Sequence, residues 1–188
     1  MTTSAPHRLQ TPLTGACARS LRAGEQVLLS GDILTGRDAA HRRLIETLDR
    51  GEALPVALAD QIIFYVGPTP PPPGAPIGAA GPTTAGRMDA YAPRLIELGL
   101  RGMLGKGKRS PEVIDAMKAH GAVYFGAIGG AAALLSKCIT ACEIVCYEDL
   151  GAEAIRKLTV KDLPATVIID TEGSNLFEIG VQTYLNSL

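Results

Sequence analysis

The segment from Gly81 to Asp89, Gly-Pro-Thr-Thr-Ala-Gly-Arg-Met-Asp, places two hydroxyl groups and one guanidinium at the start of an expected helix. Two other turns, Thr35–Asp38 and Gly105–Ser110, also combine glycine with a cationic side chain where a loop is expected to enter a helix. Glycine lets backbone N–H groups approach a ligand closely, and a helix start adds unpaired donors and a positive dipole end. Three such turns in one place would bind a small anion that carries several charges.

Length and composition set the class of protein in which this chemistry must work. With 188 residues, 46% of them hydrophobic and 20% charged, we expect one globular domain over residues 1–188, with residues 1–10 as a flexible segment. The net charge of −1 argues against a nucleic-acid partner. The chain has no apolar run long enough for a membrane span, and residues 1–14 do not resemble a secretory signal, so the expected location is cytoplasmic.

The four cysteines suggest a metal site, but their spacing argues against one. Cys142 and Cys146 fall in an expected strand, where they share a face but lie about 13 Å apart at about 3.3 Å per residue. Cys17 is remote in sequence, and no Cys-x-x-Cys pair occurs. We therefore predict no metal site in this chain and interpret the cysteines as buried, reduced thiols.

Short apolar segments alternate with segments of helical periodicity along the chain. This pattern predicts an α/β layered domain with much parallel sheet. The expected strands are 26–30, 61–66, 100–104, 122–126, 142–147, 165–170 and 176–179, and the expected helices are 37–48, 83–98 with a kink or break at Pro93, 110–120, 129–137 and 153–158.

A proline-rich run occupies residues 67–76 between the second expected strand and the Gly81–Asp89 segment. Proline at these positions is incompatible with a central strand or a helix interior, so the run is expected to be an exposed and partly extended loop. We favour a stiff loop that shapes a pocket over a peptide recognised by a proline-binding module, because the anion-binding segment follows it closely.

Five segments together resemble one known family. They are residues 31–43, 81–89, 106–110, 128–132, and 158–165 with Asp170. In this order they are similar to the C-terminal region of class I, iron–sulfur fumarate hydratases and to the related β subunit of L(+)-tartrate dehydratase. The resemblance covers residues 9–177, and several motifs in the same order are much more specific than a single glycine pattern.

The resemblance implies a fold and an activity. The fold would be a three-layer swivelling β/β/α domain with a mixed sheet. The activity would be that of a hydro-lyase, the reversible addition of water to the double bond of a C4-dicarboxylate such as fumarate. It also implies a 4Fe-4S cluster held by a separate α subunit and not by this chain. The implied assembly is a homodimer of αβ units with no nucleic-acid or membrane partner.

The same resemblance assigns roles to individual residues. Thr83 lies at the position of the family's proposed catalytic base. The implied substrate-binding residues are Arg37, Arg87, Lys106, Thr84 and Gly36. Asp38 and His41 are expected to contact these residues and hold them in position, and we expect Asp38 to orient Arg37. A guanidinium fits a carboxylate with two hydrogen bonds, and lysine adds a point charge.

Each of these residues has a simpler explanation when it is taken alone. An arginine at a helix start is often a solvated surface residue, and Thr83 or Thr84 could be a helix cap. Only the ordered combination favours the hydro-lyase interpretation. Within it, fumarate is favoured over L(+)-tartrate or another dicarboxylate. A different class stays open, in which the chain is a non-catalytic module that binds a dicarboxylate or docks to another protein.

Overall fold

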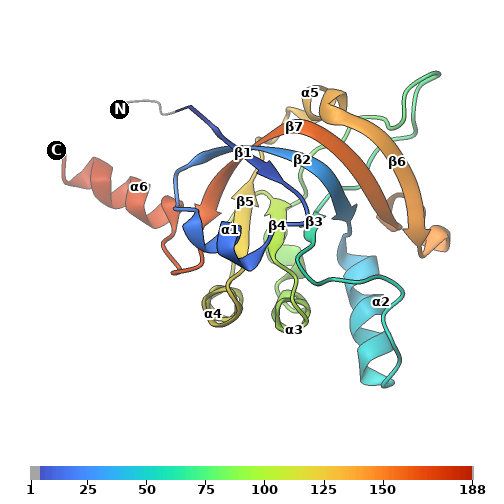
Figure 1. Cartoon of the computed structure of the whole chain (residues 1–188), viewed down its shortest axis with the longest axis horizontal. Helices are drawn as coiled ribbons and strands as arrows, with labels where there is room; N and C mark the ends of the chain where they lie inside the picture. The colour runs from blue at the N-terminus through green and yellow to red at the C-terminus, as the bar shows by residue number, and fades with distance from the viewer. Residues whose placement is uncertain (1–4, 188) are drawn as a thin grey trace.

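The computed structural model describes residues 5–187, which form seven strands and a set of helices around them (Figure 1). The strands are β1 (His7–Gln10), β2 (Gln26–Thr35), β3 (Ile62–Phe64), β4 (Gly102–Gly105), β5 (Val123–Gly126), β6 (Ile139–Cys146) and β7 (Ile155–Ile169). The α-helices are α1 (Gly15–Ser20), α2 (Asp38–Asp49), α3 (Ala92–Glu97), α4 (Pro111–His120), α5 (Ala132–Leu135) and α6 (Leu176–Leu185). Three short 3-10 helices complete the set: η1 (Ala85–Met88), η2 (Ser136–Cys138) and η3 (Glu148–Glu153).

The strands form one mixed sheet in the order β1-β2-β3-β4-β5-β7-β6. Strands β1 to β5 are parallel to their neighbours, whereas β7 runs antiparallel to β5, β6 and β2. Because β7 pairs with both β5 and β2, the strands β2, β3, β4, β5 and β7 close into a ring. The expected α/β class with a mixed sheet is therefore confirmed.

Side chains that point alternately to the two faces of the inner strands create two hydrophobic cores. Ile62 and Phe64 of β3 point into a core enclosed by the ring of strands. Ile63 of the same strand packs into a second core, which lies between the sheet and the helices. Successive side chains of a strand point to opposite faces, so every fully apolar strand contributes to both cores. Figure 1 shows α3 and α4 below β4 and β5, with β2, β7 and β6 arching over the other side. This gives the three layers of the expected architecture.

Several helix boundaries follow directly from local sequence signals. Helix α4 begins at Pro111 after Ser110 and ends at Gly121, whose φ of 70° is left-handed and suits glycine at a helix end. The expected helix over 83–98 consists of two pieces, η1 and α3, and Pro93 lies in the first turn of α3. Proline is tolerated there because the first turn has no intrahelical acceptor for its nitrogen.

Two expected elements are wrong. Residues 153–158 were expected to be helical, but from Ile155 the chain forms the long strand β7, because pairing with β2 and β6 outweighs the helix propensity of these residues. Residues 176–179 were expected to be a strand but begin α6, which is capped by Asn175. The Asn175 side chain accepts a hydrogen bond from Phe177 N (3.1 Å) and donates to Glu178 (3.0 Å), a capping arrangement visible in the sequence as Asn-x-x-Glu.

The first strand of the chain pairs with the sheet, whereas the last helix extends away from it. Residues 1–10 were expected to be flexible, but residues 7–10 form β1, which pairs in parallel with β2 from His7 to Gln10; residues 1–4 lie outside the described part. At the other end, α6 extends away from the sheet (Figure 1), and none of its ten residues is buried. Its exposed side chains include Val181 and Tyr184.

The proline-rich loop between β3 and η1 is pinched at its base. Thr69 N donates to Ala79 O (3.1 Å), and Ala79 N donates back to the Thr69 hydroxyl (2.8 Å). A Cβ atom built on Gly78 would overlap with Thr69 and with the carbonyl of Pro70, so this closure requires glycine. The tip over residues 70–74 is exposed, as the sequence predicts.

Candidate functional site at the carboxyl ends of the parallel strands

Four neighbouring strands, β2, β3, β4 and β5, are parallel, so their carboxyl ends meet at one edge of the sheet. In α/β sheets, ligands bind at this edge, in the loops that follow the strands. The sequence motifs lie in these loops: residues 36–38 after β2, 81–89 at the end of the loop after β3, 106–110 after β4, and 127–131 after β5. Topology therefore brings together segments that are far apart in the sequence.

The two threonines lie between the extensions of β3 and β4. Thr83 N donates to Tyr65 O (2.7 Å), Lys106 N donates to Thr83 O (3.2 Å), and Ala85 N donates to Lys106 O (2.8 Å). Thr83 is half-buried and Thr84 is exposed. These hydrogen bonds place the expected base next to the expected lysine, as the functional hypothesis requires. The same hydrogen bonds use the backbone N–H groups of Thr83 and Lys106, so any contribution of these two residues to ligand binding must come from their side chains.

Lys106 lies beside the fourth motif. A Cβ atom built on Gly129 would lie 3.9 Å from Nζ of Lys106, so the lysine side chain runs along this glycine turn. The turn is held in place by Ala80 N, which donates to Ala132 O (3.1 Å), and by close packing of Gly81 against Ala132. Among residues 5–187, no carboxylate forms a salt bridge with Lys106, which leaves its ammonium available to an anion.

Arg87 is joined to the first motif by two contacts. Its Nε donates to Oδ1 of Asp38 (2.9 Å), and its Nη2 lies 2.8 Å from Oδ2 of the same carboxylate. The expectation that Asp38 orients Arg37 is therefore corrected, because Asp38 pairs with Arg87. The Arg87 side chain is 48% exposed, so this pair contributes at most about 1 kcal/mol to stability. Its effect is to tie η1 to the start of α2.

Arg37 precedes α2 and is half-buried. Its Nη2 lies 3.6 Å from Oε1 of Glu153, and a Cβ atom built on Gly67 would overlap with its Nη1. Within the described residues, the buried Nε of Arg37 has no hydrogen-bond partner. The sequence motifs did not point to Glu153, which lies more than a hundred residues away and carries no local signal of this contact.

Gly36 has a different role from the one expected. Its N–H donates to Phe64 O (3.2 Å) and so continues the sheet, which removes it as a donor to a ligand. A Cβ atom on Gly36 would lie 3.1 Å from Cε1 of His41. The glycine therefore leaves room for a histidine behind the site.

His41 is completely buried and supports the backbone at Arg37. Its backbone N (2.9 Å) and its ring Nδ1 (2.8 Å) both bond to Arg37 O, which fixes the proton on Nδ1 because a carbonyl only accepts. The ring lies edge-on to Tyr65 at 5.3 Å. Burial, aided by the nearby Arg109 cation, lowers the pKa of His41 to about 4, although the hydrogen bond to Arg37 O and the Asp38 charge oppose the shift. His41 is thus neutral at pH 7 and contacts the backbone of Arg37.

A buried ion pair underlies the second and third motifs. The Arg109 side chain is fully buried, and its Nε donates to Oδ1 of Asp89 (2.7 Å), while Ser110 N donates to Oδ2 (2.6 Å). The guanidinium lies over the rings of Tyr65 and Tyr124, at 5.4 and 5.2 Å. The neighbouring Lys108 is exposed, whereas Arg109 is internal.

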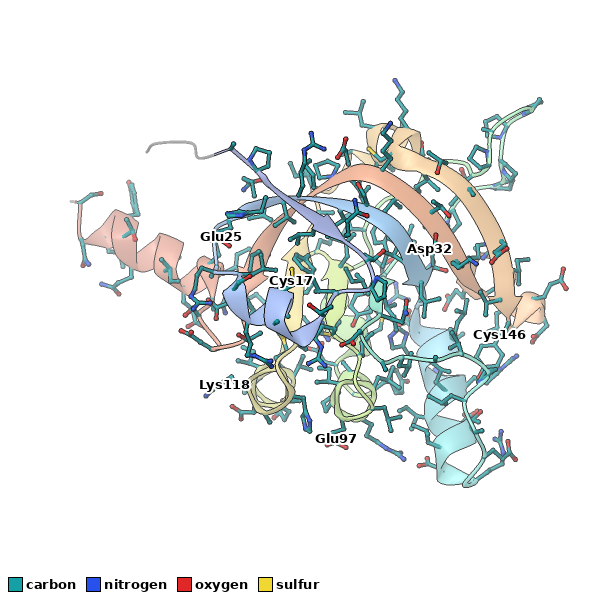
Figure 2. The ribbon with its side chains drawn as sticks, in the orientation of Figure 1. Cys17, Glu25, Asp32, Glu97, Lys118 and Cys146 are labelled. Carbon is teal, nitrogen blue, oxygen red and sulfur yellow. The ribbon has the colours of Figure 1, made fainter. Side chains whose placement is uncertain are left out.

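The cysteines do not form a metal site with other side chains in the described residues. Figure 2 shows Cys17 on α1 and Cys146 at the far end of β6, well apart in the molecule. All four are free and half-buried, rather than fully buried as expected, and burial raises the pKa of each thiol. Among residues 5–187, no three His, Cys, Asp or Glu side chains are grouped so that they could hold a metal ion. The part of the chain that the structure describes therefore offers no ligand set that fits an iron–sulfur cluster.

Comparison with known proteins identifies the family of this chain. The family described as Fumarase C-terminus matches residues 3–180, and the chain belongs to this family. No helix in the described part of the chain is both long and apolar enough to cross a membrane.

Two kinds of relatives are informative. The aerobic class I fumarate hydratases of Salmonella typhimurium and Escherichia coli are 48% and 47% identical over 152 residues, which is 80% of this chain but only 26% and 28% of theirs. The chain therefore spans about a quarter of the length of these relatives. A protein of Methanocaldococcus jannaschii with the provisional name L(+)-tartrate dehydratase subunit beta is 34% identical over 172 residues and is matched over 88% of both chains.

The buried histidine makes a prediction about pH. His41 has a pKa of about 4 when folded and 6.5 when exposed, so the unfolded state binds more protons between these values. This contribution to the free energy of unfolding is complete above pH 6.5 and is lost as the pH falls, by about 2 kcal/mol between pH 7 and pH 5. Urea unfolding of wild type and His41→Phe at both pH values measures it, and the variant should lose this difference. The exposed His120→Gln variant should keep it, and an equal pH dependence in all three proteins would contradict the assignment.

Proposed function

We propose that this chain is the β subunit of a two-subunit hydro-lyase that interconverts fumarate and malate, and that it supplies the carboxylate clamp and the candidate base. The observation that carries the proposal is that the candidate residues lie close together along the sheet edge. Asp38, next to Arg37 in the chain, pairs with Arg87 of η1, and Arg87 N donates to Thr84 O (3.4 Å). The preceding Thr83 accepts a hydrogen bond at its carbonyl from Lys106 N (3.2 Å). Membership of the Fumarase C-terminus family supports the same function.

The chemistry explains the residue types. A C4-dicarboxylate carries two negative charges, and removal of a proton beside a carboxylate builds more negative charge in the transition state. Cations that are already held in place stabilise such a charge most effectively. Arg37 and Arg87 would hold carboxylate oxygens, Lys106 would add a point charge, and the exposed Thr84 hydroxyl would donate a hydrogen bond.

Thr83 is the candidate base in this proposal. A threonine hydroxyl loses its proton only in a strongly electropositive environment. Lys106 is hydrogen-bonded through its backbone to Thr83, and Arg87 follows four residues later, so both cations belong to the same short region of structure. This arrangement supports the assignment of Thr83 as the group that takes the proton next to the substrate carboxylate.

The proposal includes a partner that carries the 4Fe-4S cluster, because the described residues of this chain offer no ligand set for it. The Methanocaldococcus relative, named as a β subunit, supports a separate α subunit, and the proposed assembly contains two αβ units. The same relative keeps L(+)-tartrate as a second candidate substrate. Four free thiols fit the reducing conditions of the cytoplasm, the proposed location.

The direct test is reconstitution with a cluster-bearing α subunit. The two chains should copurify under anaerobic conditions, and the complex should form malate from fumarate faster than it dehydrates L(+)-tartrate. This chain alone should be inactive. An intact cluster with turnover of neither substrate would exclude the enzyme and leave the non-catalytic binding or docking module. Faster turnover of L(+)-tartrate would select the second substrate.

Replacement of Arg87 tests the clamp. Arg87→Ala in the assembled enzyme should lower kcat/KM for fumarate by about 10²–10³-fold, the usual effect of removing a charged transition-state contact. Its exposed ion pair contributes little to stability, so the melting temperature should change little. Arg94→Ala is a matched control, because Arg94 is equally exposed and pairs with Asp49 on the helical side. Equal rates for Arg87→Ala and wild type would reject the assignment.

Replacement of Thr83 separates a base from a helix cap. Thr83→Val keeps the branched shape and the backbone bonds but removes the hydroxyl, and should reduce kcat by roughly 10²–10⁴-fold if the hydroxyl takes the proton. Thr83→Ser retains the hydroxyl and should keep most of the activity. Rates for Thr83→Val near those of wild type would assign proton removal to another group.

A further inference from the structure

Glu153 connects the end of η3 to the first turn of α2. Its Oε2 accepts a hydrogen bond from Ala39 N (2.9 Å), one of the backbone donors that a helix start leaves unpaired. Its Oε1 lies 3.6 Å from Nη2 of Arg37. Both side chains are largely shielded from solvent, with 25% and 22% exposed. One carboxylate therefore satisfies the helix start and contacts the guanidinium at the same time.

The backbone around Glu153 is held firmly against β2. Thr35 Oγ1 donates to Ala154 O (3.2 Å), and Arg156 N donates to Thr35 Oγ1 (2.9 Å). Thr35 is the last residue of β2, only two residues before Arg37. The carboxylate is thus positioned from a rigid element, and its location relative to the arginine does not depend on a mobile loop.

The Arg37 side chain also packs closely against backbone. A Cβ atom built on Gly67 would overlap with Nη1 and would lie 3.1 Å from Cδ of Arg37. The arginine therefore contacts both Glu153 and the bare backbone at the start of the proline-rich loop. The φ of Gly67 is not left-handed, so alanine is compatible with the backbone there and would displace only the guanidinium.

We infer that Glu153 is a positioning residue for Arg37, and this inference rests on the proposed role of Arg37 as a substrate-carboxylate clamp. An unrestrained arginine must be ordered when substrate binds, which costs conformational entropy. A guanidinium that contacts both Glu153 and the Gly67 backbone has already lost much of that freedom. Glu153 contacts Nη2 by ion pairing, and within the described residues the buried Nε has no hydrogen-bond partner.

The first measurement uses the purified chain and needs no activity. The Arg37 Nε–Hε group should be rigid in wild type by ¹⁵N relaxation, with an order parameter near about 0.85, and should fall below about 0.6 in Glu153→Gln. Gly67→Ala, whose Cβ would overlap with Nη1 of Arg37, should shift the same signal. Glu148→Gln is the matched control, because Glu148 is an exposed glutamate on η3.

The Glu153→Gln variant separates positioning from folding. Its amide oxygen can still accept from Ala39 N, so its melting temperature should stay within about 3 °C of wild type. In the reconstituted enzyme, it should raise KM for fumarate about tenfold while kcat changes less than about threefold, the pattern of lost substrate binding. The double variant with Gly67→Ala should add little, since either substitution alone already displaces the guanidinium from its position.

The two readouts distinguish the inference from the proposed function. If the wild-type complex has no activity but Glu153→Gln makes Arg37 more mobile, the positioning role of Glu153 is supported and the hydro-lyase function is rejected. An Arg37 signal that is equally rigid in wild type and Glu153→Gln overturns the inference, whatever the activity. An unchanged KM in Glu153→Gln with an active wild-type complex also overturns it.

Discussion

The organisation of the candidate site depends on the buried ion pair between Asp89 and Arg109. A guanidinium with no exposed surface is tolerated only when it is paired and hydrogen-bonded, and removal of one partner of such a pair typically costs 3–5 kcal/mol, about half the stability of a typical domain. Asp89 ends the loop that carries Thr83 and Arg87, whereas Arg109 belongs to the turn that begins at Lys106. The pair therefore fixes the two loops relative to each other from beneath.

The positive side chains of the candidate site are partly balanced by nearby carboxylates. Arg37, Arg87 and Lys106 contribute three positive charges, and Glu153 and Asp38, each paired with one arginine, contribute two negative charges, so the five groups have a net charge of +1. Such pairing prevents the cations from repelling one another at the sheet edge before a ligand arrives. Each arginine is bound through part of its guanidinium, so both keep N–H groups that make no contact with these two carboxylates. Lys106 is the cation with no carboxylate partner among residues 5–187.

The sequence predicted the parts of this site that are local, and the structure supplied the parts that depend on distance. Alternating apolar strands and helices were sufficient to predict parallel neighbours, and this predicts that loops after β2, β3, β4 and β5 meet. The contact of Glu153 with Arg37 crosses more than a hundred residues and has no periodicity. The strand over 155–158 was missed for the same reason, because its residues favour a helix until β2 and β6 pair with it. The start of α6 was predictable from Asn175 and Glu178.

The proline-rich loop has a base closed by hydrogen bonds and an exposed tip. Because the base fixes where the loop leaves the sheet, the length of the tip can change without moving that point. Thr69 and Ala79 are joined by two hydrogen bonds, and Gly78 packs so tightly there that any side chain would open the closure. Each doubling of loop length beyond such a closure costs only about 0.6 kcal/mol. Residues 70–74 can therefore accept an inserted peptide or a fluorescent label without moving β3 or Thr83, which makes this tip a suitable attachment point for engineering the protein.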